Sequence, residues 1–272
     1  MTMAARPPDR RLRPGLGQML AAQGDILYAL MLRDVRTRFF GTALGFLVTV
    51  AWPLSHLVAI ILINAGLGRA APYGESSALW FATGTVPFIA FSYVSRFCVW
   101  GMITNKPMLA YPIVRVTDIL FARVVLEILN AVIVVLILAA SFWCFGIDFV
   151  PMNIVEASKA FLAAILLGVG FGIFNSMIAA FMPLWFALYS VAMIFFWAAS
   201  GILFVPDALP DQASYWLSYN PVLQCVEWMR SAYYEGYGAH VLDKTYVLVW
   251  AIGSIFAGLA LERMMRGKIL SG

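Results

Sequence analysis

The sequence predicts an all-α integral membrane protein with six transmembrane helices. Hydrophobic residues make up 62% of the chain and charged residues only 12%, and the mean hydropathy is +0.86. Soluble domains carry about 25% charged residues. The apolar residues form runs of about 20, which is the length of a helix that crosses a hydrocarbon core of about 30 Å. The runs lack the two-residue alternation of a membrane β-barrel, so we expect helices.

Six apolar runs meet this length requirement. We expect spans at residues 42–64, 78–100, 119–145, 157–181, 184–204 and 245–264. An even number of spans places both termini on one side of the membrane. Lys and Arg gather in the two terminal segments and in the connection at 101–118, whereas Asp and Glu predominate on the opposite side. Because basic residues concentrate in short cytoplasmic segments, we expect both termini to be cytoplasmic.

The chain before the first span divides into two parts. Residues 1–17 are rich in Pro, Gly and Arg and are expected to form a disordered cytoplasmic leader. In residues 18–40 apolar side chains recur at helical spacing, at Leu20, Leu27, Met31, Val35 and Phe39. Such an amphipathic helix lies in the headgroup plane. It is either an anchor or a gate for lateral entry of a lipid into the six-span domain, residues 41–272.

The cytoplasmic connection at residues 104–118 is expected to form a short helix. Pro107 suits a first helical turn, and Pro112 ends the helix about two turns later. A solvent loop has no need of the apolar residues in this segment, so we interpret it as a docking helix for a soluble partner or as a helix packed on the membrane interface. The candidate coupling residues are Lys106, Pro107, Met108, Leu109, Tyr111 and Arg115.

The outer connection at residues 205–244 is too apolar for a plain loop and too interrupted for a span. We expect it to re-enter the outer leaflet as two short helices, the second beginning at Pro221. Glu227 and Arg230 stand three residues apart on that helix and are spaced to pair. With the neighbouring aromatic residues they define a candidate exit gate, which consists of Tyr215, Trp216, Tyr219, Glu227, Arg230, Tyr233 and Tyr234.

Ionisable residues inside spans usually face a cavity or a partner, and here they are Arg96, Arg123 and Glu127. Arg123 stands four residues before Glu127 and is spaced to pair with it, and both arginines are near enough to the cytoplasmic edge to snorkel. Aromatic rings suit a sliding sugar polymer because they offer flat faces, although Trp and Tyr, Trp197 among them, also form interfacial belts. The candidate cargo path consists of Arg96, Arg123, Trp52, Trp80 and Tyr93.

The sequence disfavours several other functions. No G-x-x-x-x-G-K-[ST] phosphate loop occurs, so we expect no cofactor in this chain and assign Mg-ATP to a separate subunit. Asp207 and Asp211 each directly follow a proline in an outer loop, where Asp commonly caps a turn, and two histidines are few for a metal site. We therefore expect no metal and no catalytic residue, with a membrane enzyme acting on lipid-linked sugars as a minor alternative. The basic residues follow topology, which argues against nucleic-acid binding.

Four segments together resemble the membrane subunits of type-2 ABC exporters, and the nearest branch is the capsular polysaccharide exporters of Gram-negative bacteria. They are RDVRTRFFGTALGFLVTVAWPL (33–54), NKPMLAYPIVR (105–115), and GILFVPDALP with YNPVLQCVEWMR (201–210 and 219–230). The resemblance implies a multi-pass inner-membrane half-transporter. Two copies would form the pore, two ATP-binding subunits would dock below it, and the 104–118 segment would be the coupling helix.

The same resemblance implies the cargo, which would be an acidic polysaccharide carried on a lipid. Exporters of O-antigen, teichoic-acid-like polymers, drugs or haem in the same superfamily are the alternatives. The outer loops are in addition a candidate surface for a periplasmic export partner.

Overall fold

A computed structural model describes residues 15–37 and 44–271. The regular secondary structure in these ranges is entirely helical, which confirms the predicted all-α class. The elements are α1 (Leu16–Thr37), α2 (Leu44–Gly66), α3 (Ser77–Asn105), η1 (Lys106–Ala110), α4 (Val116–Cys144), α5 (Ile154–Phe181), α6 (Trp185–Ala198), η2 (Pro206–Ala208), α7 (Asp211–Ser218), α8 (Pro221–Tyr233) and α9 (Lys244–Ser271). Most of the predicted leader, and the junction between α1 and α2, lie outside the described residues.

Several helices begin where local sequence signals place them. The side chain of Ser76 accepts a hydrogen bond from the backbone N–H of Leu79 and so caps α3, and Asn153 caps α5 in the same way. Asn220 caps α8, and Pro221 occupies its first turn. These polar caps satisfy N–H groups that have no partner within the helix.

Five helices, α2, α3, α4, α5 and α9, are long and apolar enough to cross a membrane. The structure corrects the prediction of a fifth span at residues 184–204. The helix found there, α6, has only 14 residues. At 1.5 Å per residue it covers about 21 Å, less than the ~30 Å of a hydrocarbon core. Gly201 adopts a left-handed backbone, with φ at 77°, and turns the chain away from the helical path. Six full-length spans are therefore not seen in the described part of the chain.

The core centres on α3 and α5, which pack closely because of glycines on α5. A Cβ atom at Gly168 would lie 2.7 Å from the backbone oxygen of Phe91, and one at Gly172 would lie 2.8 Å from Cβ of Cys98. A Cβ at Gly258 of α9 would likewise lie 2.7 Å from the backbone nitrogen of Phe174. This small-residue face of α5 thus serves helix contacts within one copy of the chain.

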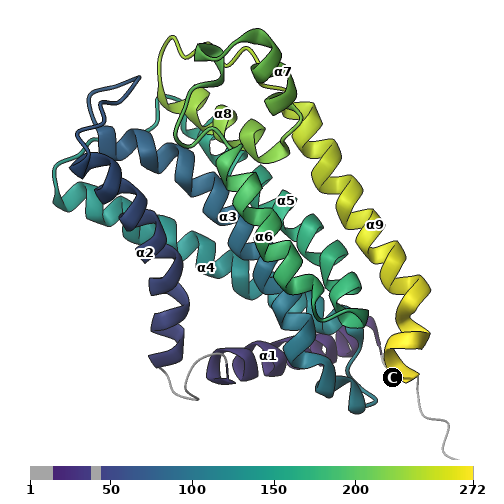
Figure 1. Ribbon diagram of the computed structural model, residues 1–272. Coiled ribbons are helices and arrows are strands. Elements are labelled where there is room, and N and C mark those ends of the chain that lie inside the picture. The colour runs from purple at the N-terminus through teal and green to yellow at the C-terminus, as the bar shows by residue number, and fades with distance from the viewer. Residues whose placement is uncertain (1–14, 38–43, 272) are drawn as a thin grey trace, which may run out of the picture.

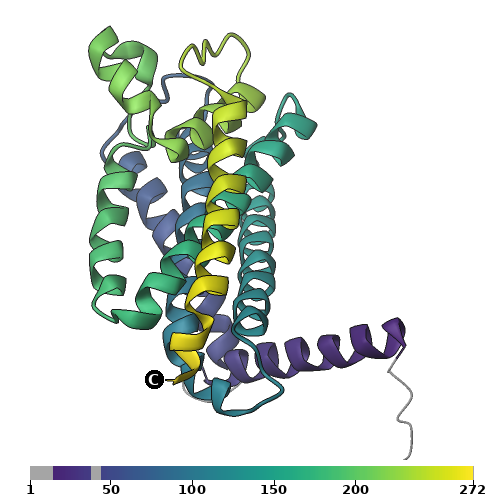
Figure 2. The ribbon, with the colours of Figure 1, turned by 90° about the vertical axis from the view of Figure 1, so that its right-hand side faces the viewer.

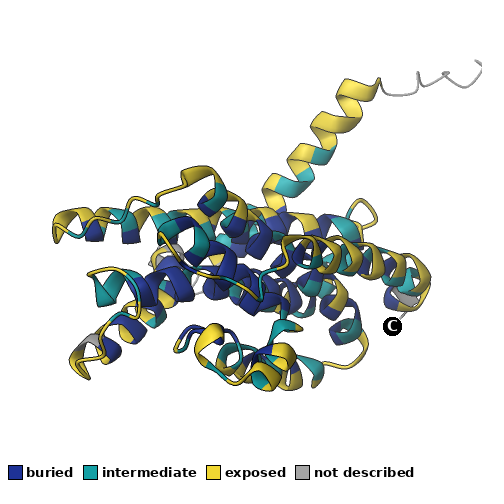
Figure 3. Ribbon diagram, turned by 90° about the horizontal axis from the view of Figure 1, so that it is seen from above, coloured by how far each residue is buried: buried dark blue, intermediate teal, exposed yellow. Residues whose placement is uncertain are grey.

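The two ends of the bundle differ. α1 lies across one end, nearly perpendicular to the long helices, and η1 and the last turns of α9 lie at the same end (Figures 1 and 2). α7 and α8 lie at the opposite end (Figure 1). From above, α1 projects beyond the bundle and its outer half is exposed (Figure 3). Both described ends of the chain thus share one end of the molecule.

Candidate functional site

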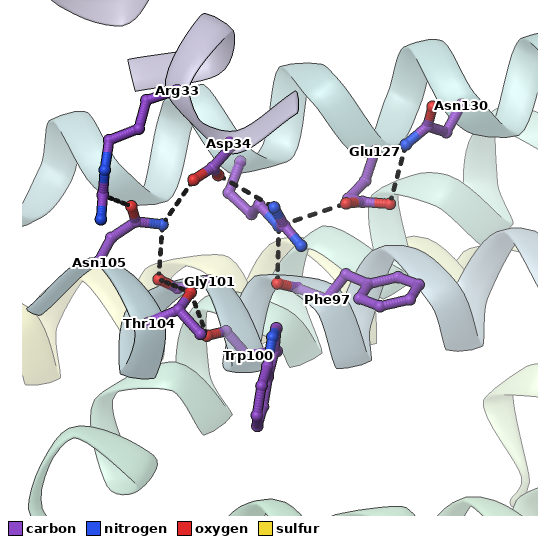
Figure 4. A network of polar contacts seen from close by, with 10 residues as sticks. Arg33, Asp34, Phe97, Trp100, Gly101, Thr104, Asn105, Glu127 and Asn130 are labelled. Atoms are coloured by element: carbon purple, nitrogen blue, oxygen red, sulfur yellow. Dashed lines mark hydrogen bonds and ion pairs between the residues drawn. The ribbon is translucent and has the colours of Figure 1, made fainter. Parts of the chain in front are cut away.

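At the α1 end, Arg123 of α4 is held inside the protein by three partners (Figure 4). Its Nη1 lies 3.0 Å from Oδ2 of Asp34 on α1, its Nε lies 3.3 Å from Oε1 of Glu127, and Nε donates a hydrogen bond of 2.9 Å to the backbone oxygen of Phe97. Gly101 of α3 makes room, because a Cβ there would lie 2.8 Å from Cγ of Arg123. The guanidinium of this predicted cargo residue is therefore already engaged.

The same network reaches the segment predicted to couple transport to a partner. Asn105, the last residue of α3, donates from Nδ2 to Oδ1 of Asp34 at 2.9 Å and also contacts Arg33. On the other flank, Asp118 accepts a bond of 2.7 Å from Nε2 of Gln23 and caps α4 through the backbone N–H of Arg115. α1 therefore binds a residue on each side of the 106–115 segment.

The 106–115 segment contains a single 3-10 helix of five residues, η1, in place of the expected two-turn helix. Pro107 occupies its first turn as predicted, and the chain turns extended at Tyr111. Met108 and Leu109 are half-buried and pack against the core. The side chains that protrude are Tyr111 and Ile113, which are 59% and 67% exposed. Lys106 is half-buried and Arg115 exposed. Ile113, which follows Pro112, is one of the apolar residues that mark this segment in the sequence, although it is not among the six candidate coupling residues.

A hollow of about 270 Å³ lies between α2, α3 and α6. Its lining comprises His56, Phe88, Ser92, Tyr93, Arg96, Ser190, Met193, Ile194 and Trp197. The Nε of Arg96 and the Nε1 of Trp197 are buried donors that find no hydrogen-bond acceptor in the described structure. Arg96 also forms no ion pair there. The hollow thus presents an unpaired cation and a free N–H among aromatic side chains, which is an arrangement suited to an anion.

The five predicted cargo residues do not lie together. Arg96 and Tyr93 line this hollow. Trp80 lies at the α8 end of the bundle, stacked on Arg230, and Trp52 is 62% exposed on α2. His56 also lines the hollow, and its Nδ1 lies 3.5 Å from the hydroxyl oxygen of Tyr93. The sequence did not predict this contact because the two residues lie on different helices, α2 and α3, whose relative position cannot be read from spacing.

At the opposite end, Arg230 of α8 is completely buried and holds the chain that follows α6. Its Nη1 donates to the backbone oxygens of Gly201 at 2.7 Å and Phe204 at 3.1 Å, and its Nη2 donates to that of Ile202 at 3.0 Å. Its distance to the predicted partner Glu227 is longer, 3.9 Å. Arg230 therefore acts mainly on a backbone segment.

Glu227 has a nearer partner in Tyr237, whose hydroxyl donates to Oε1 at 2.6 Å. α8 lies outside the five candidate spans. Burial raises the pKa of Glu227 to about 7, against the opposing effects of the Tyr237 hydrogen bond and the Arg230 charge.

The aromatic residues of the predicted exit gate fall into separate groups. Tyr234 joins Trp80 and Tyr237 around Arg230, whereas Tyr233 lines an apolar hollow between α3, α4, α5 and α8. Tyr215 and Trp216 of α7 and Tyr219, which directly follows it, form an exposed aromatic face with ring centroids 5.4 to 6.2 Å apart. A hollow of about 580 Å³ beside this face contains Asp207, Asp211 and His240. No group of three metal-binding side chains occurs in the described ranges.

Comparison with known proteins identifies relatives along most of the chain, although no family model matches it. The polysialic acid transport protein KpsM of Escherichia coli is 27% identical over 243 residues, which cover 89% of this chain and 94% of KpsM. This chain is a relative of capsule-export membrane proteins. The capsule polysaccharide export inner-membrane proteins CtrC of Neisseria meningitidis and BexB of Haemophilus influenzae are 26% and 24% identical and align with 90% and 80% of the chain. The predicted resemblance to the capsule branch is confirmed, and it supports a transport role in the inner membrane.

Proposed function

We propose that this chain is the transmembrane subunit of an ATP-driven exporter that moves a lipid-linked, acidic capsular polysaccharide across the bacterial inner membrane. The observation that carries the proposal is the hollow around Arg96, which joins an unpaired cation to aromatic surfaces between apolar helices. The relatives are named for capsule polysaccharide export, and one of them for polysialic acid, which is an acidic sugar polymer.

The hollow suits an anionic group of the cargo for a simple electrostatic reason. A cation between apolar helices is costly unless it faces a partner or water. A carboxylate or phosphate that enters the hollow gains a charge-assisted contact with Arg96 and a second hydrogen bond from Trp197. The rings of Tyr93 and Phe88 provide apolar faces for the attached sugar or lipid.

The energy is proposed to come from a separate subunit that binds Mg-ATP, because the chain contains no phosphate loop. Tyr111 and Ile113 protrude from the segment after η1 at the end opposite α7 and offer an apolar contact for that subunit. We further propose that two copies of the chain form the pore, and that the exposed aromatic face of α7 contacts the emerging glycan or a periplasmic partner.

The proposal is tested by expressing the chain with candidate ATP-binding subunits of the same organism and trapping the complex with a hydrolysis-deficient variant of the subunit. Co-purification of that subunit and recovery of an acidic glycolipid from the trapped complex are the expected results. Stimulation of ATP hydrolysis by the acidic glycolipid, and not by a neutral glycolipid of equal length, is the matched measurement. Recovery of a neutral glycan, a drug or haem would overturn the cargo assignment, and a chain that associates with no ATPase would overturn the transporter assignment.

A further inference from the structure

The helix α1 packs on the bundle through Leu30 and its neighbours and is also hydrogen-bonded to both flanks of the 106–115 segment. Gln23, near its middle, binds Asp118, and Asp34, near its end, binds Asn105. These two attachment points are 11 residues apart in the sequence, which corresponds to about 16 Å along a helix. α1 therefore binds the residue before the segment and a residue shortly after it.

Asp34 is the centre of the second attachment. One oxygen of its carboxylate accepts from Asn105 and the other lies 3.0 Å from Nη1 of Arg123, so a single side chain joins α1 to the end of α3 and to α4 (Figure 4). Asp34, Asn105 and Arg123 are all buried. A buried charge-assisted contact with two partners fixes the relative position of three helices more tightly than an exposed ion pair does.

α1 also has a surface that is free to meet the membrane. Leu16, Met19, Leu20 and Tyr28 are exposed and apolar, and the helix runs across the end of the bundle, nearly perpendicular to the long helices (Figure 2). An exposed apolar surface on a helix in this orientation is typical of helices at the headgroup level.

We propose that Asp34 is a positioning residue that makes α1 and the 106–115 segment move as one unit. This inference rests on the proposed function for its consequence, because a partner that pushes on Tyr111 and Ile113 would then displace α1 at the membrane surface. On this proposal α1 moves together with the coupling segment and is not an independent membrane anchor.

The test uses spin labels at Leu20→Cys on α1 and Ile113→Cys on the segment, which are 65% and 67% exposed. Cys144 is exposed and is replaced by Ser, whereas Cys98 and Cys225 are buried and remain. The full chain in lipid nanodiscs is measured by pulsed electron resonance without nucleotide. We expect a narrow distance between the two labels of one copy in the parent, the same narrow distance in the control Asp25→Asn, and a broadened distribution in Asp34→Asn. Asp25 is an exposed aspartate of the same helix.

Two further variants keep the result interpretable. Asp34→Asn leaves Glu127 as a counter-charge for Arg123, so the variant is expected to fold. Arg123→Lys keeps the charge but cannot hold Asp34, Glu127 and the Phe97 carbonyl together, and a smaller broadening is expected. In vesicles with the ATP-binding subunit, Asp34→Asn is expected to lower export per ATP hydrolysed about two- to thirty-fold, the usual range for residues that carry coupling.

The outcomes separate this inference from the proposed function. In the parent complex, nucleotide trapping should shift both labels relative to a third at Met264→Cys on α9 while their mutual distance stays fixed. A mutual distance that changes on trapping, or a narrow distance retained in Asp34→Asn, overturns the inference. If neither label moves relative to α9 and Tyr111→Asp leaves ATP hydrolysis unchanged, the coupling function fails, while the nucleotide-free comparison still decides whether Asp34 joins α1 to the segment.

Discussion

The guanidinium carbon of Arg230 lies 3.9 Å from the centroid of the Trp80 ring, so a buried cation rests on an aromatic face at the α8 end of the bundle. A cation–π contact is stronger where water is excluded. The same guanidinium binds three backbone oxygens that follow α6. Gly84 is required beside it, because a Cβ there would lie 2.9 Å from Nη2. One side chain thus replaces the hydrogen bonds that a longer α6 would have made.

Loss of Arg230 should therefore destabilise the outer end strongly. Arg230→Leu leaves three backbone oxygens without their donor, and each buried unsatisfied group costs about 1–3 kcal/mol. Arg230→Lys should be intermediate, since it keeps the charge and loses the fork. The control is Arg263→Leu, an exposed arginine of α9. Thermal unfolding in nanodiscs measures the effect, and equal melting temperatures for Arg230→Leu and Arg263→Leu would contradict it.

Glu227 should make stability depend on pH. Its pKa is raised to about 7 by burial, so the folded state keeps a proton that the unfolded chain releases near pH 4.5. Stability from this group is full below pH 4.5 and declines as pH rises through 7. The groups that face it are Arg230, Tyr237 and Asp207. The melting temperature of the parent should fall between pH 5 and 8, and that of Glu227→Gln should fall less. If the two proteins lose the same number of degrees over this pH range, another group is responsible.

Arg96 should matter for cargo and not for folding. Arg96→Ala removes a cation that has no ion pair in the described structure, so cargo-stimulated ATP hydrolysis should fall while basal hydrolysis and melting temperature stay close to the parent. Arg96→Lys should rescue in part because charge is kept and the two-pronged geometry is lost. Trp197→Phe, which removes only the second donor, should give a smaller loss. Equal losses of basal and stimulated hydrolysis would assign Arg96 a structural role.

The structure also changes which residues should test coupling. Tyr111→Asp with Ile113→Asp places charges on the two exposed apolar side chains and should abolish export without loss of folded protein. Leu109→Asp should lower the yield of folded protein, because Leu109 packs against the core. Val150→Asp, at an exposed apolar residue between α4 and α5, is the control. Normal vesicle export in the Tyr111 and Ile113 double variant would remove the segment from the coupling path.

Local signals in the sequence were sufficient for the positions of most helices, because apolar runs and prolines such as Pro107 and Pro221 act on their own neighbourhood. Local signals did not predict features that depend on a residue far away in the sequence. α6 ends at Ala198 because Gly201 turns the chain and Arg230, 29 residues later, binds the turned backbone. Arg123 looked like a cargo residue because its partner Asp34 lies 89 residues away on α1. Sequence spacing predicted its contact with Glu127 and could not predict the contact between helices.

The short α6 makes topology the decisive measurement for the architecture. If α6 and the chain after it cross the membrane, α7 lies outside, whereas the C-terminal end of α9, the helix that contains Met264, lies inside with α1 and η1 (Figure 1). Asp211 at the start of α7 and Met264 on α9 are both exposed, and the exposed fraction of Met264 is 80%. In a Cys144→Ser background, a reagent confined to the cytoplasm should label Met264→Cys and one confined to the periplasm should label Asp211→Cys. Labelling of Met264→Cys by the periplasmic reagent and of Asp211→Cys by the cytoplasmic one would mean that α6 turns back within the membrane, because α9 is long enough to cross and α6 alone is not. Labelling of both by the same reagent would mean that α9 does not cross.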